Sequence, residues 1–353
     1  MEILTVNVGS SSVKLDRFAL ADGGLQPLAK HRGADAPALD ALPPPAVVVH
    51  RVVHGGTFAR PALIDAPVEA QIAACAPLAP LHNPPALAMI RACRQRFGPD
   101  VPQLAVFDTA FFADLPQVAR SYALPRTLTE AHGIRRYGFH GIAHQALWRA
   151  WQAHTGRGGR VVTLQLGAGC SAAAIADGRP LDTSMGYTPL EGLVMASRSG
   201  DVDPGLLLHL QQTAGLDAAR LQDTLTHHSG LLGMAGSADM ATVLADPSPA
   251  AKLAVDVYCQ RIRKYIGAYA AVMGGLDGIV FGGGVGEHAP AVRARVLADM
   301  QWLGVRLDGA ANAGTDTDAR ITHADSPCSA WVVRVDEAGE LARAGQQLLA
   351  GMA

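Results

Sequence analysis

The sequence has few charged residues, few aromatic residues and no basic run. Only 17% of its 353 residues are charged and 5% are aromatic, and 29 Lys and Arg nearly balance 31 Asp and Glu. The formal net charge is −2, and no run of five basic residues occurs. Nucleic acids and anionic membranes bind through a basic footprint, so we expect neither partner.

Cysteine patterns and long apolar runs are also missing. The five cysteines are odd in number, lie far apart and form no CxxC pair, which points to neither a disulfide framework nor a thiolate zinc site. No secretion signal and no uncharged apolar run of 18 residues occurs, so we expect a cytoplasmic protein. The hydrophobic content of 49% over this length is enough for two cores.

Two segments share one pattern of strand, small-residue turn and strand. Residues 2–8 read as a strand, GSSS as a turn and residues 13–20 as a second strand, and residues 160–176 repeat this order around the turn GAGCS. Hydroxyls and free backbone N–H groups in such turns suit a phosphate, although the first turn reads equally as a solvated hairpin. The candidate phosphate ligands are Ser10, Ser12, Lys14, Gly167 and Gly169. The repeat predicts two similar α/β domains that face each other across a cleft, whereas residues 21–45 predict an irregular connection.

Charged residues stand at the ends of three predicted strands. Arg51 lies near the end of the strand at residues 46–53, Asp108 follows the strand at 103–107, and Glu337 follows the strand at 331–335. Ligands of open α/β sheets bind at the carboxyl ends of strands, which makes these residues candidates. The alternative for Arg51 is a surface arginine on an edge strand.

Two glycine-rich segments could approach a ligand closely. His140 lies in a loop framed by glycines, although a lone histidine is more often structural. A buried strand also runs into GGGVGEH before a helix, where missing side chains let a ligand reach the backbone.

The segment 183–204 is long for a loop without periodic structure, and such loops are uncommon unless they are functional. It carries one arginine, Arg198, and three acidic residues, Glu191, Asp201 and Asp203. The alternative is a surface loop in which Arg198 and Asp201 simply pair.

Nine motifs in the chain resemble the acetate kinase (acetokinase) family and occur in that family's order. They are NVGSSSVK, HRVVHGG, PLHNP, VFDTAFF, GIRRYGFHG, DTSMGYTPLEGL, SRSGDVDP, SGLLG and FGGGVGEH. The resemblance implies two duplicated actin-like (RNase H-like) domains, each a mixed sheet flanked by helices. It also implies homodimers, and reversible phosphoryl transfer between ATP and acetate that depends on Mg²⁺ or Mn²⁺ and gives acetyl phosphate and ADP.

The resemblance also implies boundaries and roles. We expect an N-terminal domain at residues 1–145 with a C-terminal helix at 340–353 packing back on it, and a nucleotide-binding domain at 146–339. By resemblance, the catalytic residues are Arg51, Asp108, His140 and Arg198, and the metal-associated residues are Asn7 and Glu337. The implied pocket for the methyl group of the acid consists of Val53, Leu81, Phe139 and Pro189. The implied nucleotide contacts are Asp239, Gly282, Gly283, Gly284 and Gly286.

The sequence departs from the family pattern on the nucleotide side. Ala168 stands where a phosphate-binding asparagine is usual, Ala241 where an arginine near the adenosine is usual, and His288 where GIGEN ends in asparagine. A propionate kinase, a carboxylate kinase that uses GTP or pyrophosphate, and a weakly active relative kept for ligand binding therefore remain open.

Overall fold

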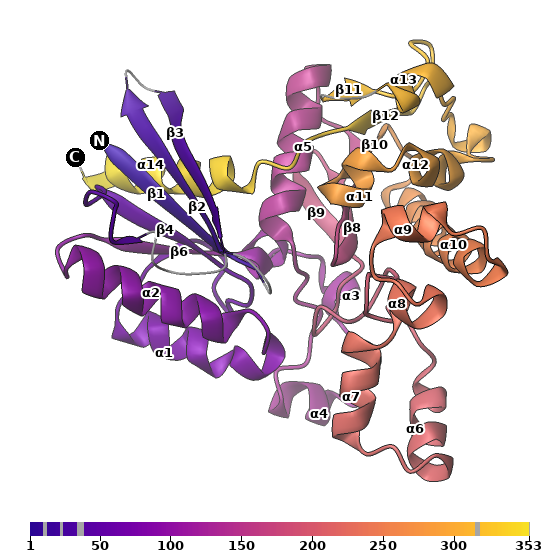
Figure 1. The fold of residues 1–353 in the computed structure, drawn as a ribbon, viewed down its shortest axis with the longest axis horizontal. Helices are drawn as coiled ribbons and strands as arrows, with labels where there is room; N and C mark the ends of the chain where they lie inside the picture. Colours follow the sequence, from indigo (N-terminus) through magenta and orange to yellow (C-terminus); the bar gives the residue numbers. More distant parts are fainter. Residues whose placement is uncertain (10–12, 22–23, 34–38, 315–317, 353) are drawn as a thin grey trace. The chain divides into compact units, whose positions relative to one another are not determined.

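The computed structural model describes residues 1–353 except 10–12, 22–23, 34–38, 315–317 and 353. The chain forms two compact units (Figure 1). Unit 1 contains residues 1–114, 137–146 and 336–353, and unit 2 contains residues 115–136 and 147–335. Residues 115–136, which the sequence led us to expect in the first domain, thus group with unit 2.

Unit 1 is built on a six-stranded sheet with the order β3-β2-β1-β4-β6-β5. Its strands are β1 (Glu2–Val8), β2 (Val13–Ala21), β3 (Gly24–Gly33), β4 (Val47–Val52), β5 (Ala62–Leu63) and β6 (Gln103–Phe107). The central strands β1, β4 and β6 run parallel, and the outer strands are antiparallel to their neighbours. The irregular connection predicted for residues 21–45 was wrong over β3, because this exposed strand has no alternation of apolar and polar residues and is held by pairing with β2.

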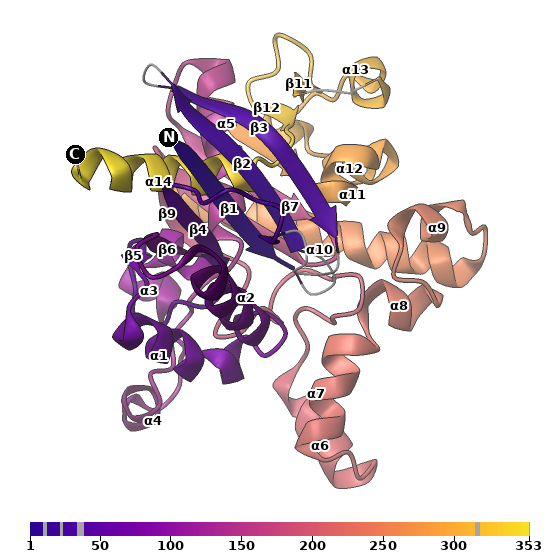
Figure 2. The same cartoon turned by 60° about the vertical axis from the view of Figure 1, so that its left-hand side comes forward.

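Helices cover both faces of this sheet (Figure 2). The helices of unit 1 are α1 (Ala66–Ala74), α2 (Asn83–Phe97), the first turns of α5 (Gly141–Thr155) and α14 (Glu337–Met352), with the 3-10 segments η2 (Ala76–Leu78) and η3 (Asp108–Phe112). On one face, Met89, Cys93 and Phe97 of α2 pack against the side chains of β1 and β4. On the other face, Leu341 and Ala342 of α14 pack against the same two strands. Strands buried on both faces tend to read as continuous apolar runs, as the first three residues of β4 do.

Unit 2 repeats this topology. Its sheet has the order β11-β12-β10-β7-β8-β9, which matches β5-β6-β4-β1-β2-β3 strand for strand, including the parallel centre. The strands are β7 (Arg160–Leu166), β8 (Cys170–Ala176), β9 (Arg179–Thr183), β10 (Gly278–Gly282), β11 (Ala319–Arg320) and β12 (Ser329–Val332). The predicted internal repeat and duplicated α/β fold are therefore confirmed.

The helices of unit 2 lie on both sides of its sheet. They are α3 (Gln117–Arg120), α4 (Arg126–Ala131), the rest of α5, α6 (Pro204–Thr213), α7 (Ala218–His227), α8 (Gly230–Ala235), α9 (Met240–Ala245), α10 (Pro249–Met273), α11 (Gly283–His288), α12 (Pro290–Leu297), η4 (Gln301–Leu303) and α13 (Gly309–Ala313). The longest helix of the described residues is α10, which Ser248 caps at its start and Gly274 ends in a left-handed conformation. Helix α10 packs on β7 and β8, whereas Leu147 and Trp151 of α5 join a core with Val161 and Val280. Among the described residues, no helix is long and apolar enough to cross a membrane.

Candidate active site

A polar cluster lies at the carboxyl ends of the parallel strands of unit 1. Asn7 is the second-last residue of β1, Arg51 is the second-last of β4, and Asp108 directly follows β6. Since the three strands are parallel neighbours, their ends meet at one edge of the sheet. Glu337, the first residue of α14, joins them.

The four side chains form one continuous network. Arg51 donates from Nε and Nη2 to Asp108 Oδ2 at 3.1 and 2.8 Å, and from Nη1 to Asn7 Oδ1 at 3.1 Å. Asn7 donates from Nδ2 to Glu337 Oε2 at 2.7 Å, and Glu337 Oε1 lies 3.7 Å from Arg51 Nη1. A guanidinium has five N–H groups. The bonds to Asp108 and Asn7 use three of them.

Burial sets the electrostatics of this cluster. The carboxyl of Asp108 is fully buried, and this desolvation raises its pKa, as the nearby Glu337 does to a lesser extent, while Arg51 acts in the opposite direction. Burial also opposes the charge of Arg51, but Asp108 and Glu337 outweigh it and raise the pKa of the guanidinium. Counted by formal charge, two carboxylates of the cluster face one guanidinium.

The start of α5 is fitted closely to Asp108. The backbone N–H of Ile142 donates to the Asp108 carboxylate, and a Cβ on Gly141 would lie only 2.0 Å from the Asp108 carbonyl oxygen. His140 precedes this turn with a φ of 57°, and Gly138 has a φ of 75°. The left-handed conformation of His140 is uncommon for a residue with a side chain and is found often at functional sites.

The expected acid pocket has members of different exposure. Val53 and Phe139 are buried, whereas Leu81 is 37% exposed. The ring of His54, the residue after Val53, contacts the ring of Phe139, with centroids 5.5 Å apart. Buried Asn83 fixes the backbone here, because it accepts from His54 N at 3.1 Å and donates to His54 O at 3.0 Å. Sequence reasoning missed this role of Asn83, although it lies within the PLHNP motif.

The residues of this cluster fit a divalent cation. Among the described residues, no three His, Cys, Asp or Glu side chains gather closely enough to hold a metal by themselves. Asp108, Glu337 and Asn7 nevertheless offer two carboxylates and one amide oxygen with an excess of negative charge. Mg²⁺ is commonly bound by one or two carboxylates, with waters and substrate phosphates as its other ligands.

In unit 2, Arg198 lies in the loop between β9 and α6. Its Nη1 donates to the carbonyl of Pro189 at 3.0 Å and lies 3.7 Å from Met195 Sδ. Burial lowers the pKa of its guanidinium. No carboxylate of the described residues lies within 4.0 Å of it, so the alternative pairing of Arg198 with Asp201 is wrong.

This loop also meets the second small-residue turn. Ala196 N donates to the carbonyl of Ala168 at 3.1 Å, and Gly167 N donates to Gly169 O at 3.1 Å. The methyl group of Ala168 is exposed, as is that of Ala241 on α9. Both positions that depart from the family pattern are therefore open to solvent.

The glycines of GGGVGEH have different reasons to be glycine. A Cβ on Gly282 would lie 2.6 Å from side-chain atoms of Leu147 and Val335, and Gly283 has a φ of 76° with a carbonyl 2.6 Å away. Gly286 would make ordinary contact at 3.4 Å, whereas a Cβ on Gly284 would meet nothing within 4 Å. Packing thus requires the first two glycines but leaves Gly284 exposed and unexplained by the fold.

The other predicted nucleotide contacts are placed as follows. Asp239 caps α9 and accepts from Thr242 N at 2.9 Å. Lys14 is exposed on β2, opposite Asn7. Ser10 and Ser12 lie outside the described residues.

Comparisons with known proteins place the chain in one family. The family model described as the acetokinase family matches residues 41–343. The chain is 45% identical over 342 residues to an acetate kinase of Clavibacter michiganensis, covering 92% of this chain and 86% of that protein. It is 47% identical over 326 residues to an acetate kinase of Leifsonia xyli, covering 90% and 82%.

Two solved structures are similar over nearly their whole length. The acetate kinase of Porphyromonas gingivalis has a TM-score of 0.89 at 35% identity, with 99% of both chains covered. A propionate kinase from Francisella tularensis has a TM-score of 0.86 at 34% identity, with 97% of this chain and 98% of that chain covered.

Proposed function

Because this chain belongs to the acetokinase family, and is thus a kinase that transfers phosphate to a carboxylate, we propose that it converts acetate and ATP reversibly to acetyl phosphate and ADP. The observation that carries this proposal is the network of Asn7, Arg51, Asp108 and Glu337 at the ends of the parallel strands. It combines an oriented guanidinium with excess negative charge for a cation. Phosphoryl transfer needs this combination more than it needs a strong base.

The proposed reaction is an in-line displacement. One carboxylate oxygen of acetate forms a bond to the γ-phosphorus, the bond between that phosphorus and the bridging oxygen breaks, and ADP leaves with the electron pair. Acetate is already ionised at pH 7, so no proton has to be removed from it. Planar arginines suit the charge that spreads over the equatorial phosphoryl oxygens.

Each residue of the proposed site has a distinct task. Arg51 and Arg198 hold the carboxylate and the transferring phosphoryl group, and His140 donates to the same charge. Asp108 and Asn7 orient Arg51 through the bonds described above. Glu337 and Asn7, with Asp108 beside them, would hold Mg²⁺ or Mn²⁺, which neutralises phosphate charge when it is bound.

Acetate rather than propionate is proposed as the preferred acid. The resemblance to the family assigns the methyl group of the acid to Val53, Leu81, Phe139 and Pro189, and of these Val53 and Phe139 are buried apolar side chains. Each additional methylene in a matched pocket changes discrimination by about 1–3 kcal/mol. A hydroxamate assay with acetate, propionate and butyrate should therefore give decreasing kcat/KM in that order. Equal values for acetate and butyrate would contradict this pocket, and nucleotide binding without any acyl phosphate would favour a relative kept for ligand binding.

ATP is proposed as the donor, with relaxed selectivity. Two residues support a nucleoside site, the exposed Gly284 of α11 and Asp239. Ala168 and Ala241, in contrast, each stand where the family usually has a side chain that donates hydrogen bonds. A lost hydrogen bond to a charged phosphate weakens binding by about 1.5–3 kcal/mol. Kinetics with ATP, GTP, CTP and pyrophosphate, repeated with Ala168→Asn and with Ala241→Arg, test this. Strict preference for ATP with no gain in either variant would show that neither alanine matters.

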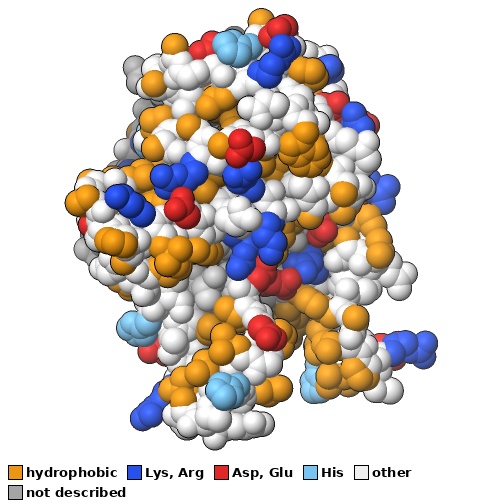
Figure 3. All heavy atoms as spheres, turned by 90° about the vertical axis from the view of Figure 1, so that its right-hand side faces the viewer, with side chains coloured by type: hydrophobic (Ala, Val, Ile, Leu, Met, Phe, Trp, Pro, Cys, Tyr) orange, Lys and Arg blue, Asp and Glu red, His pale blue; other side chains and the backbone are white. Residues whose placement is uncertain are grey.

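A homodimer and a cytoplasmic location complete the proposal. Helix α6 has no buried residue, and Leu206 and Leu208 are 45% and 58% exposed. Figure 3 shows hydrophobic side chains gathered toward its lower end, where α6 and α7 lie. A second copy of the chain would cover such a surface. All five cysteines are unpaired and buried, as expected for a reducing compartment.

A further inference from the structure

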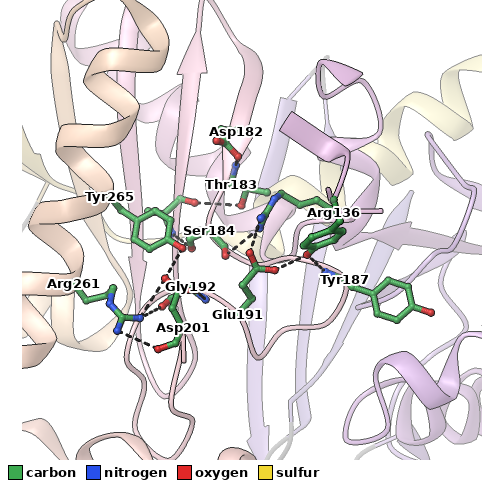
Figure 4. Close-up of polar contacts among 12 residues, drawn as sticks. Arg136, Asp182, Thr183, Ser184, Tyr187, Glu191, Gly192, Asp201, Arg261 and Tyr265 are labelled. Carbon is green, nitrogen blue, oxygen red and sulfur yellow. Dashed lines mark hydrogen bonds and ion pairs between the residues drawn. The ribbon is translucent and has the colours of Figure 1, made fainter. Parts of the chain in front are cut away.

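The loop that carries Arg198 also carries three acidic residues, and each is bonded to something other than Arg198. Asp203 caps α6 and accepts from Gly205 N at 2.8 Å. Glu191 and Asp201 are held by partners from outside the loop (Figure 4). In the sequence, these acids are the closest possible partners of Arg198 within the loop.

Glu191 is held by one arginine and one tyrosine. Arg136 Nη2 lies 2.5 Å from Glu191 Oε1, and the hydroxyl of Tyr122 donates to Glu191 Oε2 at 2.5 Å. The same hydroxyl accepts from Tyr187 N at 2.9 Å. Gly186 leaves the necessary space, since a Cβ there would lie 1.8 Å from Glu191 Oε2. We call Arg136 and Tyr122 the Glu191 clamp.

Asp201 is held in the same manner from α10. The hydroxyl of Tyr265 donates to Asp201 Oδ2 at 2.9 Å, and Arg261 Nη1 lies 3.3 Å from that oxygen. Gly192 N donates to Asp201 Oδ1 at 2.8 Å, which closes the loop upon itself. Arg261 also donates to the carbonyls of Gly192 and Asp201, at 2.9 and 3.2 Å. We call Arg261 and Tyr265 the Asp201 clamp.

The clamps leave Arg198 as the unmatched charge of this network. Arg136 balances Glu191, and Arg261 balances Asp201, while Arg198 is bonded to the neutral carbonyl of Pro189. Burial lowers the pKa of the Arg198 guanidinium, because a desolvated charge without a counter-ion is unfavourable. An anion that binds there relieves this cost. A loose carboxylate in the same loop would relieve it too, and would compete with the anion.

We propose that Arg136 and Arg261, each with its tyrosine, are positioning residues that hold Glu191 and Asp201 away from Arg198 and keep its guanidinium available to the phosphoryl group. This inference rests on the proposed function in taking a phosphoryl group as the anion. The tyrosine hydroxyls fit the role, since burial first and the carboxylates second raise the pKa of Tyr122 and Tyr265 and keep them protonated donors.

The test uses rescue by a second substitution. In Arg136→Met, the freed Glu191 carboxylate should weaken the binding of inorganic phosphate at least tenfold by calorimetry, and kcat for acetyl phosphate formation should fall in parallel. Adding Glu191→Gln removes the competing charge and should restore at least half of the loss on a logarithmic scale. Arg261→Met and Arg261→Met/Asp201→Asn should behave alike, whereas Arg136→Lys, which keeps the charge, should lose less than threefold.

The control is Arg160→Met. Arg160 forms a more exposed pair with Asp277 in unit 2, with Nη2 2.9 Å from Oδ1, outside this loop. It should not change phosphate binding. A purely structural role predicts that the double variants bind phosphate no better than the single ones, and this result would overturn the proposal. If the wild-type chain binds phosphate and shows rescue but makes no acyl phosphate from any acid, the proposed function fails and the clamps stand.

Discussion

The two arginines proposed to act on the same phosphoryl group have opposite surroundings. In unit 1, Arg51 is bonded to Asp108 and Asn7 and lies beside Glu337, so its charge is more than balanced. In unit 2, Arg198 is bonded to a carbonyl, and the acids of its own loop are held by other residues. Arg51 is thus held by acidic partners within unit 1, whereas Arg198 has no carboxylate partner among the described residues.

Because of this difference, replacing Arg51 and replacing Arg198 should have different effects on the stability of the folded protein. A buried ion pair is costly to break because the remaining partner keeps an unpaired charge. A buried charge without a counter-ion can be removed with little loss, and its removal can stabilise the folded state. From the sequence alone, the two arginines are expected to behave alike, with a loss of turnover and almost no change in melting temperature.

The largest effect is expected for Arg51→Met. The kcat should fall by roughly 10³-fold or more, the scale of losing an arginine finger. The free energy of unfolding should also fall by about 3–5 kcal/mol, because Asp108 remains buried and unpaired. Urea unfolding and the hydroxamate assay measure both, with Arg160→Met as the control for an exposed pair. A loss of activity at unchanged stability would remove the contrast with Arg198.

Arg198→Met should give a similar loss of kcat, on the order of 10³-fold, with a melting temperature equal to or above that of the wild type. The reason is that this guanidinium lies in a desolvated place without a carboxylate partner among the described residues. Calorimetric melting beside single-turnover kinetics tests the prediction. Strong destabilisation of this variant would mean that Arg198 is paired in the folded protein after all.

As the pH falls, unit 1 should lose stability before unit 2. Burial lowers the pKa of His50, the neighbour of Arg51, to about 4, and that of His144 to about 3. An unfolded histidine binds its proton below about pH 6.5, so the unfolded state binds more protons between that pH and the folded pKa. Stability should therefore fall as the pH falls through this window, by about 3 kcal/mol for His50 at 1.36 kcal/mol per pH unit.

Urea midpoints at pH 7, 6 and 5 measure this loss. His50→Gln should make the free energy of unfolding depend less steeply on pH than in the wild type. At pH 5, backbone amides of unit 1 should exchange hydrogen faster than those of unit 2, because unit 1 opens first. Asp108 acts in the other direction, since its raised pKa adds stability that is lost as the pH rises. An unchanged slope in His50→Gln would show that His50 is not a neutral buried group.

The smallest effect is expected for Gly284, which contrasts with the closely packed Gly141. Gly141→Ala should disrupt the Asp108 site of unit 1, where a Cβ has no space. Gly284→Ala in α11 of unit 2 should stabilise the protein by about 0.5–1 kcal/mol, yet raise KM for ATP if the nucleotide approaches this backbone. Gly267→Ala on α10, where a Cβ also meets nothing within 4 Å, is the matched control for stability alone. Unchanged nucleotide affinity in Gly284→Ala would place the nucleotide elsewhere.

The sequence was sufficient for the fold because its repeat is local. Two strand–turn–strand segments of similar order lie in the sequence of β1–β2 and β7–β8, and the observed sheets have matching topology. Strand β3 could not be predicted, because an exposed strand held by pairing alone leaves no hydrophobic pattern. The grouping of residues 115–136 with unit 2 was also missed, since it depends on contacts such as Arg136 with Glu191, 55 positions apart.

The candidate site, like the fold, could be predicted in part. Arg51, Asp108 and Glu337 were singled out because charged residues at strand ends are conspicuous, and the structure brings them together with Asn7. The partners of Arg198 were not predictable. Its loop contains one arginine and three acids, and a sequence does not reveal that Arg261 and Tyr265, 60 and 64 positions away, hold Asp201.

The bond between Asn7 and Glu337 spans 330 positions of the chain. During synthesis at roughly 5–20 residues per second, β1, β4 and β6 leave the ribosome tens of seconds before α14. Throughout that interval, the face of the sheet formed by Ile3 and Val49 lacks its cover, and Arg51 lacks one of its acids. A nascent chain of this protein therefore exposes apolar strand surface until α14 has emerged.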